Sequence, residues 1–222
     1  MAIKKTPTSY DSEPMIKKWR LVHDEHLRDA ICSDLPKEQK NLILIDGRSG
    51  NGKSTFANKL ANCIDAIIVH TDDISWHHHP FNWVQEIQDE VIIPWRMGRD
   101  INYKPPAWIA MNRKGSITAA AKSSLIIEGV GAGRSELARS DTLVVWVQAN
   151  HADVYNRAIK RDMVNENRTR SQAEDFWAEW MSLEEPFIEN DRPWTRAHYI
   201  VNGTPPKNTI PNATYIADGP LT

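Results

Sequence analysis

The chain has 222 residues, of which 41% are hydrophobic and 25% charged, a composition typical of one globular α/β domain with a substantial core. Its net charge of −2 and the absence of any lysine or arginine block argue against a nucleic-acid partner. No apolar run approaches the ~20 residues of a membrane span, and no apolar segment behind Met1–Pro7 resembles a secretory signal. Cys32 and Cys63 lack metal-ligand spacing, so we expect a reducing, cytoplasmic location.

The first predicted elements lead into a glycine-rich loop. Apolar residues recur on one side of the segment from about 13 to 34, which predicts an N-terminal helix on the outside of the domain. The next elements are predicted as a buried strand Leu42–Asp46, the loop Gly47–Ser54, a helix from Thr55 to about Cys63 and a buried strand Ala66–His70. The order strand, glycine-rich loop, helix is typical of phosphate-binding sites.

The loop matches the pattern G-x-x-x-x-G-K-S/T at every fixed position. Its glycines let backbone N–H groups turn inward, and the helix that follows adds the positive end of its dipole. Lys53 supplies a mobile positive charge for the β- and γ-phosphates, and Ser54 a hydroxyl for Mg²⁺ bound to them. The sequence therefore predicts a nucleoside triphosphate site formed by Gly47, Ser49, Gly50, Asn51, Gly52, Lys53, Ser54 and Thr55.

An aromatic- and proline-rich stretch from about 71 to 116 is predicted to form a cap-like insertion. We expect a helix between Phe81 and Ile93, ended by Pro94 because a proline disfavours helical backbone in the residue before it. The later elements are predicted as strands Ser124–Glu128 and Thr142–Val147, a helix His151–Val164, a helix from Ser171 to about Ile188 broken near Pro186, and a last strand His198–Val201. Apolar strands alternating with helices predict an α/β fold: a mostly parallel five-stranded sheet with helices on both faces, in a single domain over 1–222.

Acidic residues follow two of these strands, at the edge where ligands bind in open α/β sheets. Asp72 and Asp73 come after the second strand, and Glu128 ends the third. A carboxylate there can accept the proton of an attacking hydroxyl, orient that hydroxyl, or bind near Mg²⁺; capping of a turn is the alternative for the aspartates. Adjacent residues leave a strand in different directions, so only one aspartate can be the base, and the sequence leaves the choice between Asp72, Asp73 and Glu128 open.

Four arginines form the densest cationic cluster of the chain: Arg157, Arg161, Arg168 and Arg170. Over about 157–170 they have the pattern of a lid, whose arginines stabilise charge on a transferring phosphoryl group and exclude water. A surface salt-bridge ladder from Asp153 to Arg157 is the alternative.

Two groups of ring side chains remain open to interpretation. His77, His78 and His79 are adjacent and could bind a transition metal, but a polar loop or plain surface fits them better because neighbouring residues rarely point at one ion. Several tryptophans outside the predicted strands either pack under long loops or line a pocket for a flat ligand: Trp76, Trp83, Trp95, Trp108, Trp177, Trp180 and Trp194.

Taken in order, these segments resemble the uridine kinase family of P-loop kinases, a group that also includes phosphoribulokinase and type I pantothenate kinase. The segments that carry the resemblance are Gly47–Ser54, Thr71–Asp73, Tyr103–Trp108, Ile126–Gly129, Arg161–Asp162 with Arg168–Arg170, Pro186–Glu189 and Tyr199–Gly203. The resemblance implies a P-loop NTPase three-layer sandwich that uses ATP and Mg²⁺. The segment Trp76–Trp95 has no counterpart in the family, so the match is better in the phosphate-binding half than in the acceptor half.

The resemblance also implies roles for individual residues. Asp72 would be the catalytic carboxylate. The other catalytic residues would be Lys53, Arg161 and Arg168, of which the two arginines would hold the ATP phosphates. The acceptor would be bound by Asp72, Tyr103, Trp108, Glu128 and Arg170. Ser54 and Glu128 would bind Mg²⁺, and Asn202 and Gly203 would lie near the adenine.

These observations predict an ATP- and Mg²⁺-dependent kinase that phosphorylates a hydroxyl of a small molecule, with a nucleoside or nucleoside-like compound as first choice. The alternatives are a kinase of another small alcohol, such as a vitamin precursor, glycerate or an antibiotic, and a nucleotide-dependent switch or ATPase without a small acceptor. The expected partners are the nucleotide and the acceptor, without nucleic acid or membrane, and a homo-oligomer is left open.

Overall fold

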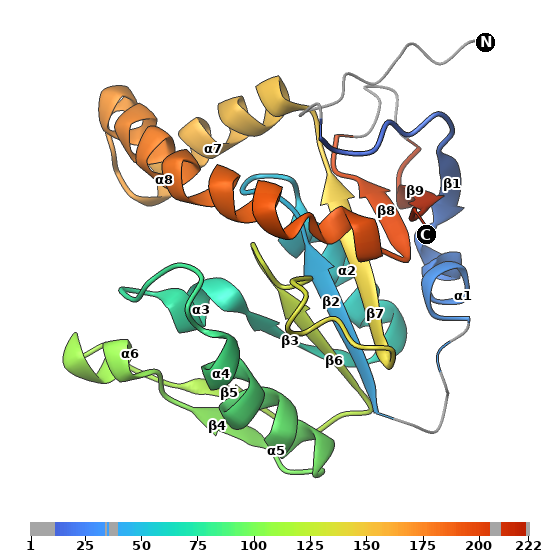
Figure 1. Ribbon diagram of the computed structural model, residues 1–222, viewed down its shortest axis with the longest axis horizontal. Helices are drawn as coiled ribbons and strands as arrows, with labels where there is room; N and C mark the ends of the chain where they lie inside the picture. The colour runs from blue at the N-terminus through green and yellow to red at the C-terminus, as the bar shows by residue number, and fades with distance from the viewer. Residues whose placement is uncertain (1–11, 34, 36–39, 205–209, 221–222) are drawn as a thin grey trace.

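The computed structural model describes residues 12–33, 35, 40–204 and 210–220, and its centre is a twisted sheet (Figure 1). The strand order in this sheet is β1-β9-β8-β7-β2-β6-β3. The bounds of these strands are β1 Arg20–His23, β2 Asn41–Asp46, β3 Ala66–His70, β6 Ser124–Glu128, β7 Thr142–Gln148, β8 Tyr199–Asn202 and β9 Ala213–Asp218.

The five strands β3, β6, β2, β7 and β8 run parallel, and β2, which leads into the glycine-rich loop, lies between β6 and β7. These are the five strands expected from the sequence, and the predicted α/β fold is confirmed. Two antiparallel strands extend the sheet beyond β8: β9 pairs with β8, and β1 pairs with β9. Neither strand was expected from the sequence, because β1 is a short edge strand and β9 lies between two antiparallel partners, so the place of each depends on its neighbours rather than on its own pattern.

Helices cover both faces of the sheet, as the continuous apolar strands predict. Ile43 and Ile45 of β2 pack into one apolar cluster with α1 (Leu27–Cys32) and α2 (Lys53–Ile64). Leu42 and Leu44, which alternate with them, pack into a second cluster with the inserted segment and the end of α8 (Arg170–Asp191). This alternation gives the three layers of the fold.

The prediction of one N-terminal helix over about 13–34 is wrong for the residues before Asp24. Arg20–His23 is the strand β1, and the helical residues are the 3-10 turn η1 (Asp24–His26) and α1, while Asp34 and Met1–Pro7 lie outside the described residues. The apolar spacing in this segment also suits a strand, and pairing with β9 satisfies the backbone of 20–23.

Both prolines that were expected to stop or break a helix lie within continuous helical segments. Pro94 lies in the first turn of α5 (Ile93–Arg96), which continues α4 (Val84–Ile87) and the π-helix η2 (Gln88–Ile92). Pro94 directly follows the π-helix, whose wider turns do not keep the regular hydrogen bonds of an α-helix, so a residue without an N–H fits there. Pro186 lies inside α8, where the buried side chains of Glu184 and Ile188 on either side of it hold the helix against the core.

The inserted segment lies beside the edge strand β3 (Figure 1). After α3 (Thr71–Ser75) and the helical segment from α4 to α5 it forms a hairpin of β4 (Ile101–Tyr103) and β5 (Ile117–Ala119), joined through α6 (Pro106–Ala110). Beyond the carboxyl ends of the parallel strands lie α7 (His151–Asn165) and α8, and the 3-10 turn η3 (Pro193–Arg196) leads into β8. Within the described residues, no helix combines the length and the apolar character needed to cross a bilayer.

Candidate functional site

The glycine-rich loop lies at the carboxyl end of β2 and is fixed to the end of β7. Gly47 has a φ of +155°, and a Cβ on it would lie 2.4 Å from the carbonyl oxygen of Val147. The Asn51 side chain donates to the same carbonyl oxygen at 2.7 Å, and Gly52 adopts a left-handed conformation directly before α2. The loop is therefore held in one shape by a neighbouring strand, as a preformed anion site requires.

The loop and its surroundings enclose a cavity of about 300 Å³, called the phosphate cavity below. Lys53 is buried, and its Nζ donates to the carbonyl oxygen of Arg48 at 3.1 Å, so the ammonium group curls over the loop. The residues that line the cavity are Ser49, Gly50, Gly52, Lys53, Ser54, Thr55, Asp72, Glu128, Val130, Arg157, Ala158 and Arg161. Most of the predicted nucleotide-binding residues thus come together around one space.

Asp46 anchors the phosphate-binding loop to the loop that follows β6, a role the sequence analysis did not assign. Its carboxylate is fully buried and accepts hydrogen bonds from the backbone N–H groups of Gly47 at 2.6 Å, Gly131 at 2.9 Å and Gly133 at 2.9 Å. Burial raises the pKa of Asp46 to about 6, although the three hydrogen bonds oppose the shift. The sequence offered one sign of this role: Asp46 ends a strand, and the Gly-x-Gly-x-Gly pattern of Gly129, Gly131 and Gly133 follows another strand.

Replacement of Asp46 by asparagine is expected to lower the free energy of unfolding by about 2–3 kcal/mol, because an amide group cannot accept all three bonds and leaves a buried N–H unpaired. Urea denaturation measures this loss. Asp141→Asn is a matched control, since Asp141 is 58% exposed in its ion pair with Arg96 and should contribute less than about 1 kcal/mol. Equal losses in the two variants would contradict the anchoring role of Asp46.

Ser54 and Glu128 lie together at the floor of the phosphate cavity. The Ser54 hydroxyl donates to Glu128 Oε1 at 3.2 Å, and His70 Nδ1 lies 2.6 Å from Glu128 Oε2. Burial alone would raise the pKa of Glu128, but the hydrogen bond from His70 and the charge of Lys53 outweigh it, so this pKa lies below its usual value. The result is a hydroxyl oxygen beside an ionised carboxylate, the type of hard oxygen ligand that suits Mg²⁺.

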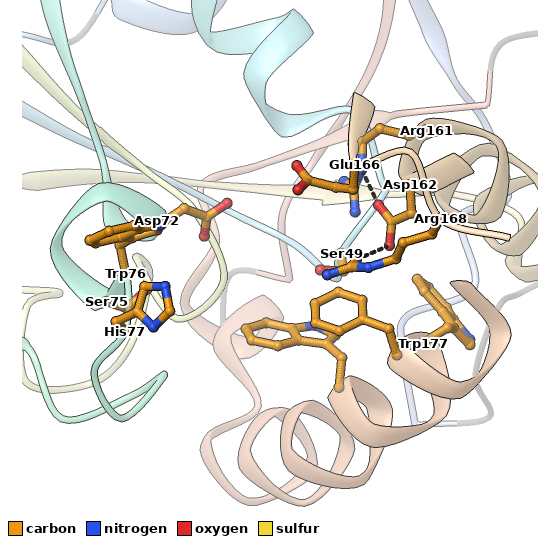
Figure 2. A pocket seen from close by; sticks show the side chains of 12 residues that line it. Ser49, Asp72, Ser75, Trp76, His77, Arg161, Asp162, Glu166, Arg168 and Trp177 are labelled. Carbon is orange, nitrogen blue, oxygen red and sulfur yellow. Dashed lines mark hydrogen bonds and ion pairs between the residues drawn. The ribbon is translucent and has the colours of Figure 1, made fainter. Parts of the chain in front are cut away.

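A larger cavity of about 660 Å³, called the aromatic cavity below, adjoins the phosphate cavity (Figure 2). Of the residues that the structure describes, three line both spaces: Ser49, Asp72 and Arg161. The remaining lining residues are Ser75, Trp76, His77, Asp162, Glu166, Arg168, Phe176, Trp177 and Trp180. The phosphate-binding loop therefore opens directly into a space large enough for a small molecule.

Of the two adjacent aspartates, only Asp72 faces these cavities. Its carboxylate points into the cleft (Figure 2). The walls of the cleft desolvate this group and raise the pKa of Asp72, while the charge of Lys53 opposes the shift. Asp73 instead forms an ion pair with Arg113 at 2.9 Å, and its carbonyl oxygen accepts the indole N–H of Trp108. The start of α3 thus turns one carboxylate toward the loop and the other into the insertion.

The predicted lid arginines lie in three different environments. Arg161 and Arg168 line the aromatic cavity and both pair with Asp162, at 3.0 and 3.3 Å. Arg170 pairs with Glu174 in α8 and lines neither cavity. Arg157 donates to the carbonyl oxygen of Gly203 at 2.9 Å rather than forming the ion pair with Asp153 that a surface ladder requires.

Other predicted site residues lie at different distances from the cavities. Tyr103 hydrogen-bonds to Glu86, and Trp108 is buried behind Trp76, with ring centroids 6.5 Å apart, so neither lines the aromatic cavity. A Cβ on Gly203 would lie 1.8 Å from the carbonyl oxygen of Asn51, which places Gly203 against the phosphate-binding loop. Asn202 precedes Gly203, and its side-chain oxygen accepts the backbone N–H of Thr204 at 2.9 Å.

The three adjacent histidines do not form a metal centre. Only His77 lines the aromatic cavity, and His79 Nδ1 accepts the backbone N–H of Phe81 at 3.2 Å. Among residues 12–33, 35, 40–204 and 210–220, no group of three or more His, Cys, Asp or Glu side chains is placed to hold a metal ion.

Glu184 links the phosphate-binding loop to the wall of the aromatic cavity, which the sequence analysis did not foresee. Its side chain is fully buried, and one oxygen accepts both the backbone N–H of Ser49 at 3.0 Å and the indole N–H of Trp180 at 2.6 Å. Burial raises the pKa of Glu184. No signal in the sequence marks this residue, because Ser49 lies 135 positions away.

Glu184→Leu is expected to weaken nucleotide binding about tenfold, since the Ser49 N–H loses its acceptor and the loop loses a fixed point. Glu184→Gln should retain affinity within about twofold, because the amide oxygen can accept both hydrogen bonds. Isothermal calorimetry with Mg²⁺ and ATP measures both constants. Tight binding by the leucine variant would show that Glu184 has no part in shaping the loop.

Comparison with known proteins bears mainly on the fold. No protein-family model matches the chain, and no curated protein matches it. Among solved structures, the YGR205w protein is similar at 11% identity and a TM-score of 0.51, with 81% of this chain and 89% of that one covered. A structure described as a possible uridine kinase from Bacillus stearothermophilus aligns at 16% identity and a TM-score of 0.47, covering 80% of this chain and 96% of that one. A shikimate kinase from Acinetobacter baumannii in complex with shikimate aligns at 16% identity and a TM-score of 0.36, covering 78% and 87%.

The fold and the loop together define the class of the protein. A parallel sheet with the phosphate-binding strand at its centre, helices on both faces and the G-x-x-x-x-G-K-S/T loop at a strand end make this a P-loop NTPase fold. The predicted three-layer sandwich with a mostly parallel sheet is therefore confirmed, and the likeness to the YGR205w protein supports it at the level of fold.

Proposed function

We propose that the chain is an ATP- and Mg²⁺-dependent kinase that transfers the γ-phosphate to a hydroxyl of a small molecule, of which a nucleoside or nucleoside-like compound is the preferred class. The observation that carries this proposal is the junction of the two cavities at Asp72, Ser49 and Arg161. A switch or simple ATPase needs the phosphate cavity alone, whereas a kinase needs a second compartment that opens onto the γ-phosphate.

Asp72 is the proposed base. At the junction it can accept the acceptor's hydroxyl proton while the hydroxyl oxygen attacks the γ-phosphorus; the bond to the β-phosphate oxygen breaks, and ADP leaves. A base works best when its pKa is near the working pH, and the raised pKa of Asp72 moves it in that direction. Asp73 is a poorer candidate, because Arg113 already holds its carboxylate.

Positive charge for the transferred phosphoryl group would come from the loop and from the lid. Lys53 curls over the loop, and Arg161 faces both cavities. Arg161 and Arg168 both pair with the carboxylate of Asp162. Because two guanidinium groups share one carboxylate, they can leave it in part and bind the phosphates instead. We propose that this movement also closes the site against water, which otherwise competes with the acceptor.

The oxygens of Ser54 and Glu128 are the groups that would hold Mg²⁺. A Mg²⁺ ion at that place would neutralise charge on the β- and γ-phosphates. The small number of protein ligands fits Mg²⁺, which usually keeps several waters and phosphate oxygens.

The test compares ADP formation from ATP with and without a panel of nucleosides and other small alcohols. Stimulation by an acceptor, together with appearance of its phosphate ester, is the expected result. ATP turnover that no acceptor changes would favour the switch or ATPase.

A further inference from the structure

The walls of the aromatic cavity carry a combination of rings and charges that selects among acceptors. Trp76 comes from the segment after α3, and Phe176, Trp177 and Trp180 come from α8. Two of these rings are held in place by neighbours: Trp180 by its hydrogen bond to Glu184, and Trp177 by an edge-on contact with Tyr155 at 6.0 Å between ring centroids. Fixed indole faces around one space favour flat or cationic groups.

The charges in this cavity favour a cation. In the described part of the chain, its charged lining residues are Asp72, Asp162, Glu166, Arg161 and Arg168, three carboxylates against two guanidinium groups. Both guanidinium groups are paired with Asp162, and within the described residues the Glu166 carboxylate has no ion-pair or hydrogen-bond partner. Figure 2 shows the carboxylates of Asp72 and Glu166 pointing into the space between them.

Binding of ATP would make this imbalance larger. If the proposed function is correct, Arg161 and Arg168 turn toward the phosphates, and Asp162 and Glu166 then face the acceptor. Anionic acceptors such as carboxylic acids and phosphate esters would meet uncompensated negative charge.

We infer that the acceptor is an alcohol that carries a positively charged nitrogen. Its hydroxyl lies at Asp72, and its cation lies among the tryptophan rings with Glu166 as the counter-charge. The inference rests on the proposed function, and it narrows the acceptor class to cationic members.

Three alcohols of nearly the same shape test this inference: an N-methylpyridinium methanol, the neutral methylbenzyl alcohol and the anionic hydroxymethyl benzoate. Tryptophan fluorescence titrations of the full chain, with Mg²⁺ and a non-hydrolysable ATP analogue present, give the three dissociation constants. We expect the cation to bind at least about tenfold more tightly than the neutral alcohol, and the anion most weakly.

Variants locate the effect. Glu166→Gln should reduce the preference for the cation over the neutral alcohol several-fold, whereas Glu179→Gln, an exposed carboxylate on α8 outside the cavity lining, should leave it unchanged. Equal binding of cation and neutral alcohol, absence of saturable binding of the cation, or an unchanged preference in Glu166→Gln would each overturn the inference. Failure of the proposed function would appear separately, as charge-selective binding without phosphorylation of any acceptor.

Discussion

Replacement of Lys53 by alanine is expected to lower phosphoryl transfer by about a hundred- to a thousandfold. Its ammonium group is buried within the phosphate-binding loop and would meet the β- and γ-phosphates, where charge develops during transfer. Among the residues that the structure describes, no other lysine lines the phosphate cavity. The rate of ADP formation at saturating acceptor measures the loss.

The fold of this variant should remain intact, because the Lys53 ammonium group donates to a loop carbonyl rather than to the core. Circular dichroism and the midpoint of thermal unfolding check this. Lys59→Ala is a matched control on the same helix, since Lys59 pairs with Asp24 away from both cavities. Wild-type turnover in Lys53→Ala would refute the assignment of the loop as the phosphate site.

Asp72→Asn is expected to lower kcat by about a hundred- to ten-thousandfold, the range for loss of a general base. An asparagine keeps the shape of the side chain but cannot accept the hydroxyl proton. Affinity for ATP should change by less than roughly threefold, so the effect falls on kcat rather than on nucleotide binding. Steady-state kinetics together with calorimetry separate the two.

The pH profile gives an independent check on Asp72. Because burial raises the pKa of Asp72, the wild-type kcat should fall as the pH is lowered through a value above the ~3.9 of a free aspartate. This acid limb should be absent from the residual activity of Asp72→Asn. Asp73→Asn is the matched control and should retain the limb; a normal kcat in Asp72→Asn would move the base to Asp73 or Glu128.

Several features of the site depend on residues far apart in the sequence. Glu184 accepts the backbone N–H of Ser49 across 135 positions, and Asp46 accepts that of Gly133 across 87. Side chains that meet only in the folded chain leave no local pattern, so the sequence could name the loop but not the groups that hold it. The same reason explains Tyr103, whose motif suggested the acceptor site and whose hydroxyl bonds to Glu86 instead.

The sequence by itself determined the phosphate-binding loop, the five parallel strands and the strand ends where the site lies. These follow from local rules: the glycine spacing that lets a loop cup an anion, and the apolar runs that mark strands buried on both faces. Only the tertiary structure decided that Asp72 rather than Asp73 faces the loop, that Arg170 points away from it, and that β1 is a strand. Each of these outcomes depends on the direction in which a side chain leaves its element, or on a partner strand, and packing of the whole chain fixes both.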